Sequence, residues 1–354
     1  MNATLETSCG SSGTGVSPVC CDIVMPPASE PPTTSLPPPD RRDACPTTNA
    51  TTLASRLSSA SIVRANEPLA KRTTLRVGGP ADIYVEPASE ADLAATLRFV
   101  AENTLPLFVL GRGSNLLIRD GGVRGVVLCL AQPHFTRIEA DGQRLRCGAG
   151  AKLKDVANEA KRAGIAGLEF LEGIPGCVGG ALRMNAGAYG GAMFEVVASL
   201  RFMDYAGAAQ DVPVAKIEAG YRSCSFFKTH IALGAVLHGR AAERAEIEQR
   251  MGECSQKRWS SQPKAPSAGC AFKNPTTIQA GRLIDELGLK GTKVGGAMVS
   301  LEHGNFIVTS AGTTARDVLG LMDLIKQHAR TERGIELESE VQIIGEDAGE
   351  TLKC

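Results

Sequence analysis

The chain has 354 residues, of which 43% are apolar, and this length predicts two or three domains with ordinary packed cores. Its 38 lysines and arginines balance its 38 aspartates and glutamates, which excludes a broad basic footprint for nucleic acid or an acidic membrane surface. No apolar run approaches the length of about 18 residues that a membrane span requires.

Residues 1–60 differ in composition from the rest of the chain. They are rich in Ser, Thr and Pro, show neither helical nor strand periodicity, and contain few large apolar residues. Such a segment buries too little surface to offset its conformational entropy. We therefore expect a disordered extension, with the folded protein beginning near Ser61; a misassigned start codon is the alternative.

The folded part begins with alternating strand and helix patterns. Residues 82–86 (DIYVE) predict a strand, and Ser89 with Asp92 predicts a capping box that opens a helix through about Asn103. Short strands are expected at 107–110 and 125–130, with a glycine-rich loop between them.

Beyond residue 130 the same mixture continues, and a change of pattern near residue 240 predicts a domain boundary. Helices are expected at 152–163, where Gly164 is the stop signal, and at 241–259, 281–287 and 314–333. Strands are expected around Arg137 and Leu145 and at 305–309 and 337–344. The pattern predicts an α+β protein.

The eleven cysteines do not have the spacing of a disulfide framework or a zinc site. There is no Cys-x-x-Cys pair, the count is odd, and Cys129 lies in the apolar run 126–130. We expect buried free thiols in a reducing cytoplasm, and no metal site.

Two segments contain the glycines expected of a loop around an anion or a cofactor. Residues 111–120 (GRGSNLLIRD) follow a strand, but Leu116 replaces the third glycine of a dinucleotide fingerprint and no helix follows. The segment is therefore compatible with either a tight turn between strands or a phosphate-binding loop. Residues 173–191 have seven glycines in nineteen positions, and they favour a cofactor cradle over a flexible loop.

A third segment, residues 266–275 (PSAGCAFKNP), places the Cys270 thiol, the Lys273 ammonium group and the Asn274 amide within five residues. Taken singly, Cys270 fits a small buried residue and Lys273 fits a solvated charge. Only their combination with the other motifs indicates a site.

Seven motifs in order closely resemble the UDP-N-acetylenolpyruvoylglucosamine reductase (MurB) family over roughly residues 61–346. The motifs are 74–80 (TLRVGGP), 111–120, 174–190, 220–223 (GYRS), 266–275, 281–296 and 338–345 (ESEVQIIG). The short stretch between Gly239 and Pro266 is similar to the subgroup that lacks an extra tyrosine-bearing loop.

The resemblance implies a two-lobed FAD-binding domain of the PCMH type at 61–240, with lobes at about 61–130 and 131–240. A smaller α+β substrate-binding domain would follow at 241–346, with a tail at 347–354. The implied enzyme is an oxidoreductase that uses NADPH and non-covalent FAD to make UDP-N-acetylmuramate for peptidoglycan. The implied setting is the cytoplasm, in cell-wall biogenesis, cell shape and division, as a monomer or weak homo-oligomer.

The resemblance also assigns roles to individual residues. Arg222, Cys270 and Glu340 would be catalytic; a guanidinium can bind the substrate carboxylate with two hydrogen bonds, and Glu340 must be protonated, so we expect burial to raise its pKa. The residues expected to contact FAD are Gly111, Arg112, Gly113, Ser114, Asn115, Ile174, Gly179, Gly180, Ala186 and Gly187. Tyr189, Lys273 and Asn274 are expected to bind the substrate diphosphate and sugar.

Cys270 departs from the family pattern, in which serine is usual at this position. A free thiol is far more acidic than an alcohol, so Cys270 could donate the proton, or it could lose that proton too easily at high pH. A tolerated spacer, with water as donor, is the third possibility.

Two other functions fit the same scaffold less well. A flavin oxidase of alcohols or sugars often tethers its flavin through a histidine in the early phosphate loop, but the first histidine here is His134. A non-catalytic nucleotide-sugar sensor would lack the combination of Arg222, Cys270 and Glu340.

Overall fold

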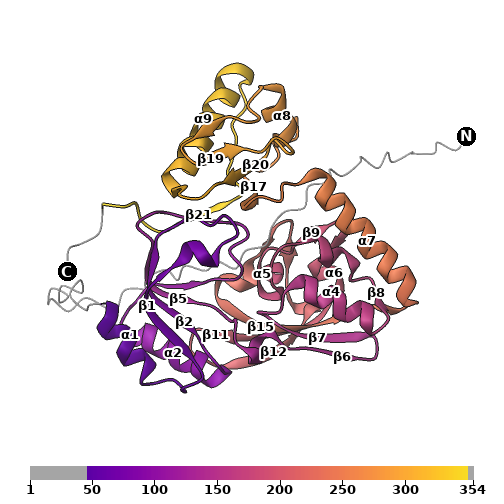
Figure 1. Cartoon of the computed structure of the whole chain (residues 1–354). Helices are drawn as coiled ribbons and strands as arrows, with labels where there is room; N and C mark the ends of the chain where they lie inside the picture. The colour runs from indigo at the N-terminus through magenta and orange to yellow at the C-terminus, as the bar shows by residue number, and fades with distance from the viewer. Residues whose placement is uncertain (1–45, 350–354) are drawn as a thin grey trace, which may run out of the picture.

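The computed structural model describes residues 46–349, which form three lobes (Figure 1). The first 45 residues of the predicted extension and the last five of the predicted tail lie outside this range. None of the helices within 46–349 combines the length and the apolar character needed to cross a bilayer.

The first lobe contains a four-stranded sheet in the order β1-β2-β5-β3. Strand β1 is antiparallel to β2, whereas β2, β5 and β3 run parallel. Ser89 caps helix α2 by accepting a hydrogen bond from the Asp92 backbone N–H, as the capping box predicts. The elements of this lobe are α1 (Pro46–Ala54), β1 (Ile62–Pro68), β2 (Pro80–Glu86), α2 (Glu90–Glu102), β3 (Leu107–Val109), β4 (Leu116–Ile118) and β5 (Val123–Leu128).

The prediction that all of residues 1–60 are disordered is wrong for residues 46–60. Helix α1 packs on β1 and β2, with the side chain of Leu53 fully buried and that of Ala50 nearly so. Two apolar residues three positions apart give this threonine-rich helix a narrow buried face, which composition alone did not reveal.

The second lobe is an antiparallel sheet in the order β12-β11-β15-β7-β6 with helices on one side. Helix α4 ends before Gly164, which has a φ of +67°, as the stop signal predicts. The strands of the sheet are β6 (Ile138–Asp141), β7 (Arg144–Gly148), β11 (Val197–Asp204), β12 (Ala209–Pro213) and β15 (His230–His238). The helices are α3 (Pro133–Thr136), which precedes β6, α4 (Leu153–Arg162), α5 (Val178–Arg183), α6 (Met193–Val196) and α7 (Arg244–Ser261). Short paired strands complete the lobe: β8 (Ile165–Ala166) with β16 (Arg240–Ala241), β9 (Gly187–Ala188) with β10 (Gly191–Ala192), and β13 (Ala219–Gly220) with β14 (Ser223–Cys224).

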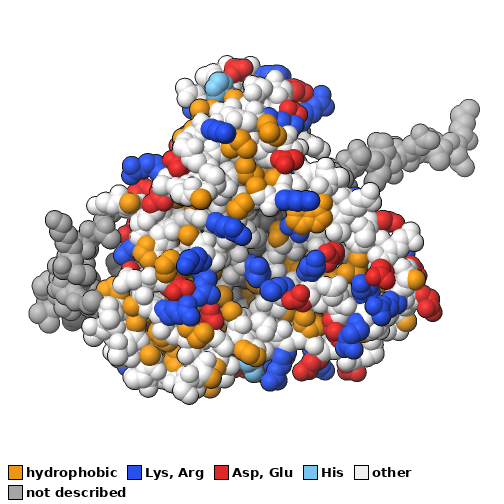
Figure 2. Space-filling model, viewed as in Figure 1, with side chains coloured by type: hydrophobic (Ala, Val, Ile, Leu, Met, Phe, Trp, Pro, Cys, Tyr) orange, Lys and Arg blue, Asp and Glu red, His pale blue; other side chains and the backbone are white. Residues whose placement is uncertain are grey.

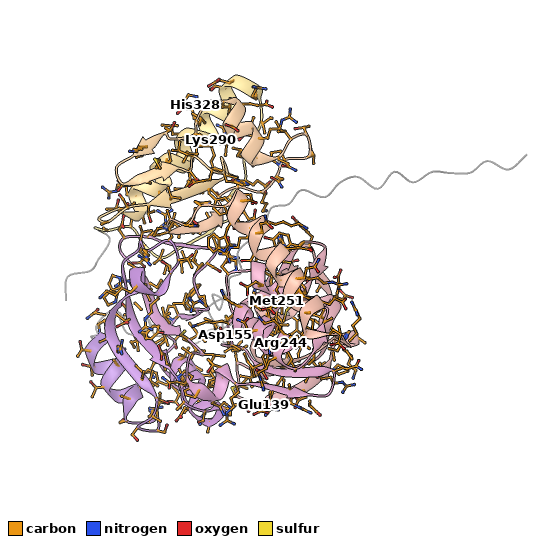
Figure 3. All side chains as sticks on the ribbon, turned by 45° about the vertical axis from the view of Figure 1, so that its right-hand side comes forward. Glu139, Asp155, Arg244, Met251, Lys290 and His328 are labelled. Carbon is orange, nitrogen blue, oxygen red and sulfur yellow. The ribbon has the colours of Figure 1, made fainter. Side chains whose placement is uncertain are left out.

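Helix α7 belongs by its contacts to the second lobe, although the sequence assigned it to the substrate-binding domain. Its buried residues Ile247 and Met251 join the hydrophobic core of the first two lobes, and the helix packs on α4 and on the turn Glu169–Gly173. Figure 3 shows Met251 beside the second lobe, while Lys290 and His328 lie far away in the third. We therefore propose that the third lobe begins near residue 262.

The third lobe is an antiparallel sheet, β17-β20-β19-β18, covered by α8 and α9. Its elements are β17 (Ser267–Cys270), α8 (Ala280–Glu286), β18 (Lys293–Val294), β19 (Ala297–Val299), β20 (Phe306–Thr309) and α9 (Ala315–Arg333). The predicted strand at 337–344 is shorter, β21 (Gln342–Ile344), and pairs in parallel with β4 of the first lobe. This pairing joins the third lobe to the end of the glycine-rich loop 111–115.

Candidate active site

A cavity of about 330 Å³ lies between the first and second lobes. Its first-lobe wall includes residues that follow β3 and β5, such as Gly111, Arg112 and Cys129, together with residues 71–74. The carboxyl ends of parallel strands meet at one edge of a sheet, which is a common place for a cofactor. The second-lobe wall includes Gly179 and the start of β15.

The cavity has a basic lining. The basic side chains among its described lining residues are Lys71, Arg72, Arg112, Lys152 and Arg183, and no acidic residue is among them. The Arg183 Nε is buried without a hydrogen-bond partner. Figure 2 shows Lys and Arg side chains gathered around the middle of the face where the lobes meet. A dinucleotide diphosphate fits a cavity of this charge.

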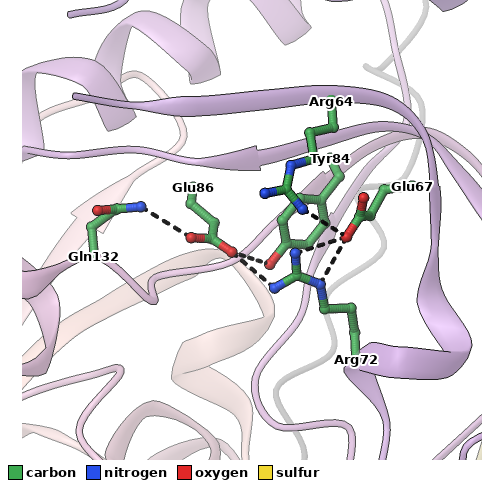
Figure 4. Close-up of polar contacts among 6 residues, drawn as sticks. All are labelled: Arg64, Glu67, Arg72, Tyr84, Glu86 and Gln132. Carbon is green, nitrogen blue, oxygen red and sulfur yellow. Dashed lines mark hydrogen bonds and ion pairs between the residues drawn. The ribbon is translucent and has the colours of Figure 1, made fainter. Parts of the chain in front are cut away.

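Arg72 is held at the cavity wall by a network of charged and polar side chains (Figure 4). Its guanidinium donates to Glu67 at 2.7 Å and to Glu86 at 3.0 Å, and lies 4.4 Å from the centre of the Tyr84 ring. The Tyr84 hydroxyl and the Gln132 amide also donate to Glu86. Because Glu86 is nearly buried, these donors stabilise its charge and fix the shape of the wall.

Of the ten residues expected to contact FAD, Gly111, Arg112 and Gly179 line the cavity. Gly113 is required by a close approach: its φ is +58°, and a Cβ there would meet the Thr73 Cα at 2.8 Å. The others that do not line it are Ser114, Asn115, Ile174, Gly180, Ala186 and Gly187. Their contact with the cofactor stays a prediction.

The side chains of Ser114 and Asn115 make protein contacts that the sequence did not indicate. The Ser114 hydroxyl donates to the Pro175 carbonyl at 2.9 Å, which ties the first glycine-rich segment to the second. The Asn115 side-chain amide is fully buried and donates to the Glu340 carbonyl at 3.2 Å, and the Asn115 backbone carbonyl accepts from the Gln342 N–H. The loop therefore connects the cavity to the third lobe.

The three predicted catalytic residues come from three separate segments and meet where the lobes join. Arg222 lies in the two-residue turn between β13 and β14, with a φ of +54°, and Asn185 ties this hairpin down by donating to the Gly220 carbonyl. Cys270 ends β17, opposite Phe306 of β20. Glu340 lies beside them, because its backbone N–H donates to the Ala271 carbonyl at 2.9 Å.

Burial dominates the electrostatics of this trio. It raises the pKa of Glu340 to about 7, although the positive charges of Arg222 and Lys273 oppose the shift. The predicted direction for Glu340 is thus confirmed, with burial in the protein itself as the cause. Burial also raises the pKa of the Cys270 thiol to about 12, so this thiol stays protonated at neutral and moderately alkaline pH.

The Arg222 guanidinium has few protein partners. One of its N–H groups donates to the Gly187 carbonyl at 3.3 Å, its Nε is buried without a partner, and it lies 5.0 Å from the ring centre of the exposed Tyr221. A guanidinium with an unused buried donor is suited to an anionic ligand.

The predicted substrate-binding residues lie in different surroundings. Lys273 is exposed and pairs with Glu338 at 2.9 Å, and the Asn274 side-chain oxygen accepts from the Ala280 N–H at the start of α8. The Tyr189 hydroxyl is buried without a partner, and this burial raises its pKa to about 12 against the opposing charge of Arg258 on α7. Arg258, which the sequence gave no reason to select, also has a buried Nε without a partner.

The six cysteines among the described residues are all free. Four of them are buried as expected (Cys147, Cys177, Cys224 and Cys270), whereas Cys129 and Cys254 are partly exposed. Within the same part of the chain no group of three or more His, Cys, Asp or Glu side chains is arranged to hold a metal ion.

Two family models match the chain. Residues 81–212 match an FAD binding domain, and residues 262–344 match the C-terminal domain of UDP-N-acetylenolpyruvoylglucosamine reductase. The second match covers the lobe that contains Cys270 and Glu340, which disfavours an FAD oxidase of alcohols or sugars.

Individual relatives agree with these models. The chain is 44% identical over 285 residues to UDP-N-acetylenolpyruvoylglucosamine reductase 2 of Symbiobacterium thermophilum, covering 80% of this chain and 92% of that one. It is 42% identical to the reductase of Clostridioides difficile, covering 80% and 94%. The crystal structure of the Thermus caldophilus reductase (MurB) has a TM-score of 0.70 at 39% identity, covering 80% and 99%. The chain therefore belongs to the UDP-N-acetylenolpyruvoylglucosamine reductase family of FAD-binding oxidoreductases.

Proposed function

We propose that the chain reduces UDP-N-acetylglucosamine enolpyruvate to UDP-N-acetylmuramate with NADPH as the electron source. The observation that carries this proposal is the convergence of Arg222, Cys270 and Glu340 at the junction of the lobes. We place this activity in the cytoplasm, in the synthesis of peptidoglycan precursors.

The cavity residues would hold the cofactor. Arg112, Lys152 and Arg183 supply positive charge for the diphosphate, while Gly111 and Gly179 allow the backbone to come close. With FAD held there, the cofactor would supply the hydride-transfer chemistry that reduction of the enolpyruvyl group requires.

Arg222 and Glu340 would stabilise the charge that builds up on the substrate carboxylate after hydride addition. The guanidinium binds the carboxylate through its unused donors, and Glu340, when protonated, donates a further hydrogen bond. With a pKa of about 7 before substrate binds, Glu340 is readily protonated, and a nearby substrate carboxylate would raise this value further.

Cys270 would protonate the carbon adjacent to the carboxylate. The S–H bond breaks, the new C–H bond forms, and the electron pair stays on sulfur until solvent returns a proton. The pKa of about 12 removes the danger of premature loss of this proton at alkaline pH. It also makes the thiol a weak acid, which requires precise placement against the substrate carbon.

The substrate diphosphate would bind beside Tyr189 and Arg258. Two buried polar groups without partners, the Tyr189 hydroxyl and the Arg258 Nε, support an anion there. The Asn274 amide nitrogen and Lys273 would contact the sugar nucleotide from the third lobe, with Lys273 exchanging Glu338 for the ligand.

The test is NADPH oxidation by the purified protein with and without the enolpyruvyl sugar nucleotide. We expect a yellow protein that bleaches anaerobically with NADPH and recovers its colour when the substrate is added. UDP-N-acetylmuramate should form in a 1:1 ratio to NADPH consumed. Bleaching without substrate-dependent recovery would contradict the proposed substrate while leaving a flavoenzyme.

A further inference from the structure

Asn305 is a buried polar residue next to Cys270 that the proposed function leaves without a role. It immediately precedes β20, only 2% of its surface is exposed, and its side chain lies near Cys270, where it opposes the rise in the thiol pKa that burial causes. A buried amide must have its hydrogen bonds satisfied, so its partners show what it holds in place.

Three hydrogen bonds link Asn305 to the two residues that follow Cys270. Its carbonyl accepts from the Ala271 N–H at 2.8 Å. Its side-chain oxygen accepts from the Phe272 N–H at 2.9 Å, and its side-chain nitrogen donates to the Phe272 carbonyl at 2.8 Å. The amide therefore takes the place of a strand partner at the point where the regular pairing of β17 ends.

The same two residues also locate Glu340. The Glu340 N–H donates to the Ala271 carbonyl at 2.9 Å, and Phe272 forms an isolated bridge with Ser339. Fixing Ala271 and Phe272 thus fixes the spacing between the thiol and the carboxyl group.

Asn305 is itself held firmly. Its backbone N–H donates to His303 Nδ1 at 3.1 Å, and the His303 and Glu302 N–H groups donate to the Ser300 hydroxyl. Burial lowers the pKa of His303, which keeps the imidazole neutral and its Nδ1 free to accept. The turn 300–305 is therefore a rigid support for the amide.

The chemistry of proton donation gives this amide a specific use. Its nitrogen carries two hydrogens, and the Phe272 carbonyl takes one, so the second is available to sulfur. When the thiol gives its proton to carbon, an N–H donor stabilises the thiolate left behind, because hydrogen bonds to charged groups are stronger.

We propose that Asn305 is a positioning residue for proton transfer, which orients the Cys270 thiol and stabilises the thiolate by hydrogen bonding. The proposal rests on the proposed function, in which Cys270 is the proton donor. It makes Asn305 necessary for reduction of the substrate and dispensable for reduction of the flavin.

The test compares two half-reactions of Asn305→Asp, which keeps the size and one acceptor oxygen but loses both N–H donors. We expect flavin bleaching by NADPH at the wild-type rate and reoxidation by substrate slowed roughly 10- to 100-fold, the size of one hydrogen bond to a charged group. The solvent deuterium isotope effect on reoxidation should rise. Asn103→Asp, the same charge change at the end of α2, is the control and should alter neither half-reaction.

The decisive comparison repeats the change in a Cys270→Ala background, where no thiol remains to be oriented. We expect Asn305→Asp to slow reoxidation there by less than about threefold. An equal loss in both backgrounds would overturn the proposal, because it would show a general structural effect. If Asn305→Asp loses its flavin or unfolds at a lower temperature than wild type, Asn305→Ser replaces it. The same two backgrounds are then compared, and the same outcomes decide. If Cys270→Ala alone reduces substrate at the wild-type rate, Cys270 is not the proton donor. That result overturns the donor role in the proposed function, and it differs from an equal loss in both backgrounds, which overturns only the role of Asn305.

Discussion

The cofactor cavity and the catalytic trio are built in different ways. The cavity is lined by the first two lobes alone, and each wall combines several segments of one lobe, such as residues 71–74, 109–112 and 129–131 of the first. The trio combines a hairpin of the second lobe with β17 and the segment before β21 in the third. Cofactor binding should therefore survive changes that abolish substrate reduction.

The largest expected effect is on the rate of substrate reduction when Cys270 is changed, because this residue belongs to the catalytic trio and not to the cofactor cavity. Cys270→Ala should slow substrate reduction roughly 10²- to 10⁴-fold, the usual contribution of a positioned general acid, with flavin reduction unchanged. Rapid-mixing absorbance of each half-reaction measures this. Cys270→Ser is the matched variant and should stay near the wild-type rate. Unchanged turnover in Cys270→Ala would instead make water the donor.

A change in α1 should act on stability alone. Leu53→Ala removes a fully buried side chain and should lower the free energy of unfolding by about 2–5 kcal/mol. Thr51→Ala, at an exposed position of the same helix, is the control for denaturant unfolding. Equal midpoints for the two variants would mean that α1 is not packed on the first lobe.

The pH dependence should reveal Glu340. Substrate reduction requires its protonated form, so kcat/KM for the substrate, which reports the free enzyme, should fall about tenfold per pH unit above the pKa of about 7. Flavin reduction should lack this dependence, and in Glu340→Gln the remaining substrate reduction should lack it too. A wild-type profile that stays flat to pH 9 would exclude the role.

Ionisation of the Glu340 carboxyl group should also lower the free energy of unfolding as the pH rises. Its pKa is raised on folding from an ordinary value of 4.5, so its stabilising contribution is complete below pH 4.5 and is lost as pH rises through about 7. The free energy of unfolding of Glu340→Gln, relative to that of wild type, should therefore be higher at pH 8 than at pH 5. Melting curves at both pH values provide the check.

The smallest effect concerns Asp120, the last residue of the first glycine-rich motif. Its carboxylate accepts from the Ala315 and Arg316 N–H groups at the start of α9, at 2.7 and 3.0 Å. Asp120→Ala should lower the free energy of unfolding by about 1 kcal/mol, as for a lost helix cap, without changing flavin content. Asp323→Ala, on the exposed side of α9, is the control. Loss of flavin would place Asp120 in the cofactor site.

Local sequence patterns determined much of the fold. The capping box at Ser89, the stop at Gly164 and the periodicity of α9 each depend on neighbours a few residues apart. The motifs with Arg222, Cys270 and Glu340 identified the family for the same reason, since each occupies one short segment. The sequence alone also showed that Cys270 places a thiol where the family usually has a hydroxyl.

Only the tertiary structure decided which of these residues face the cavity and which hold the lobes together. Ser114 and Asn115 are predicted cofactor ligands, and the structure adds contacts that hold the lobes together: Ser114 donates to the Pro175 carbonyl, and Asn115 donates to the Glu340 carbonyl beside the β4–β21 pair. The raised pKa values of Cys270 and Glu340 come from burial at that same junction. Contacts between segments more than a hundred residues apart leave no periodic signal, so the lobe junction had to be seen in three dimensions.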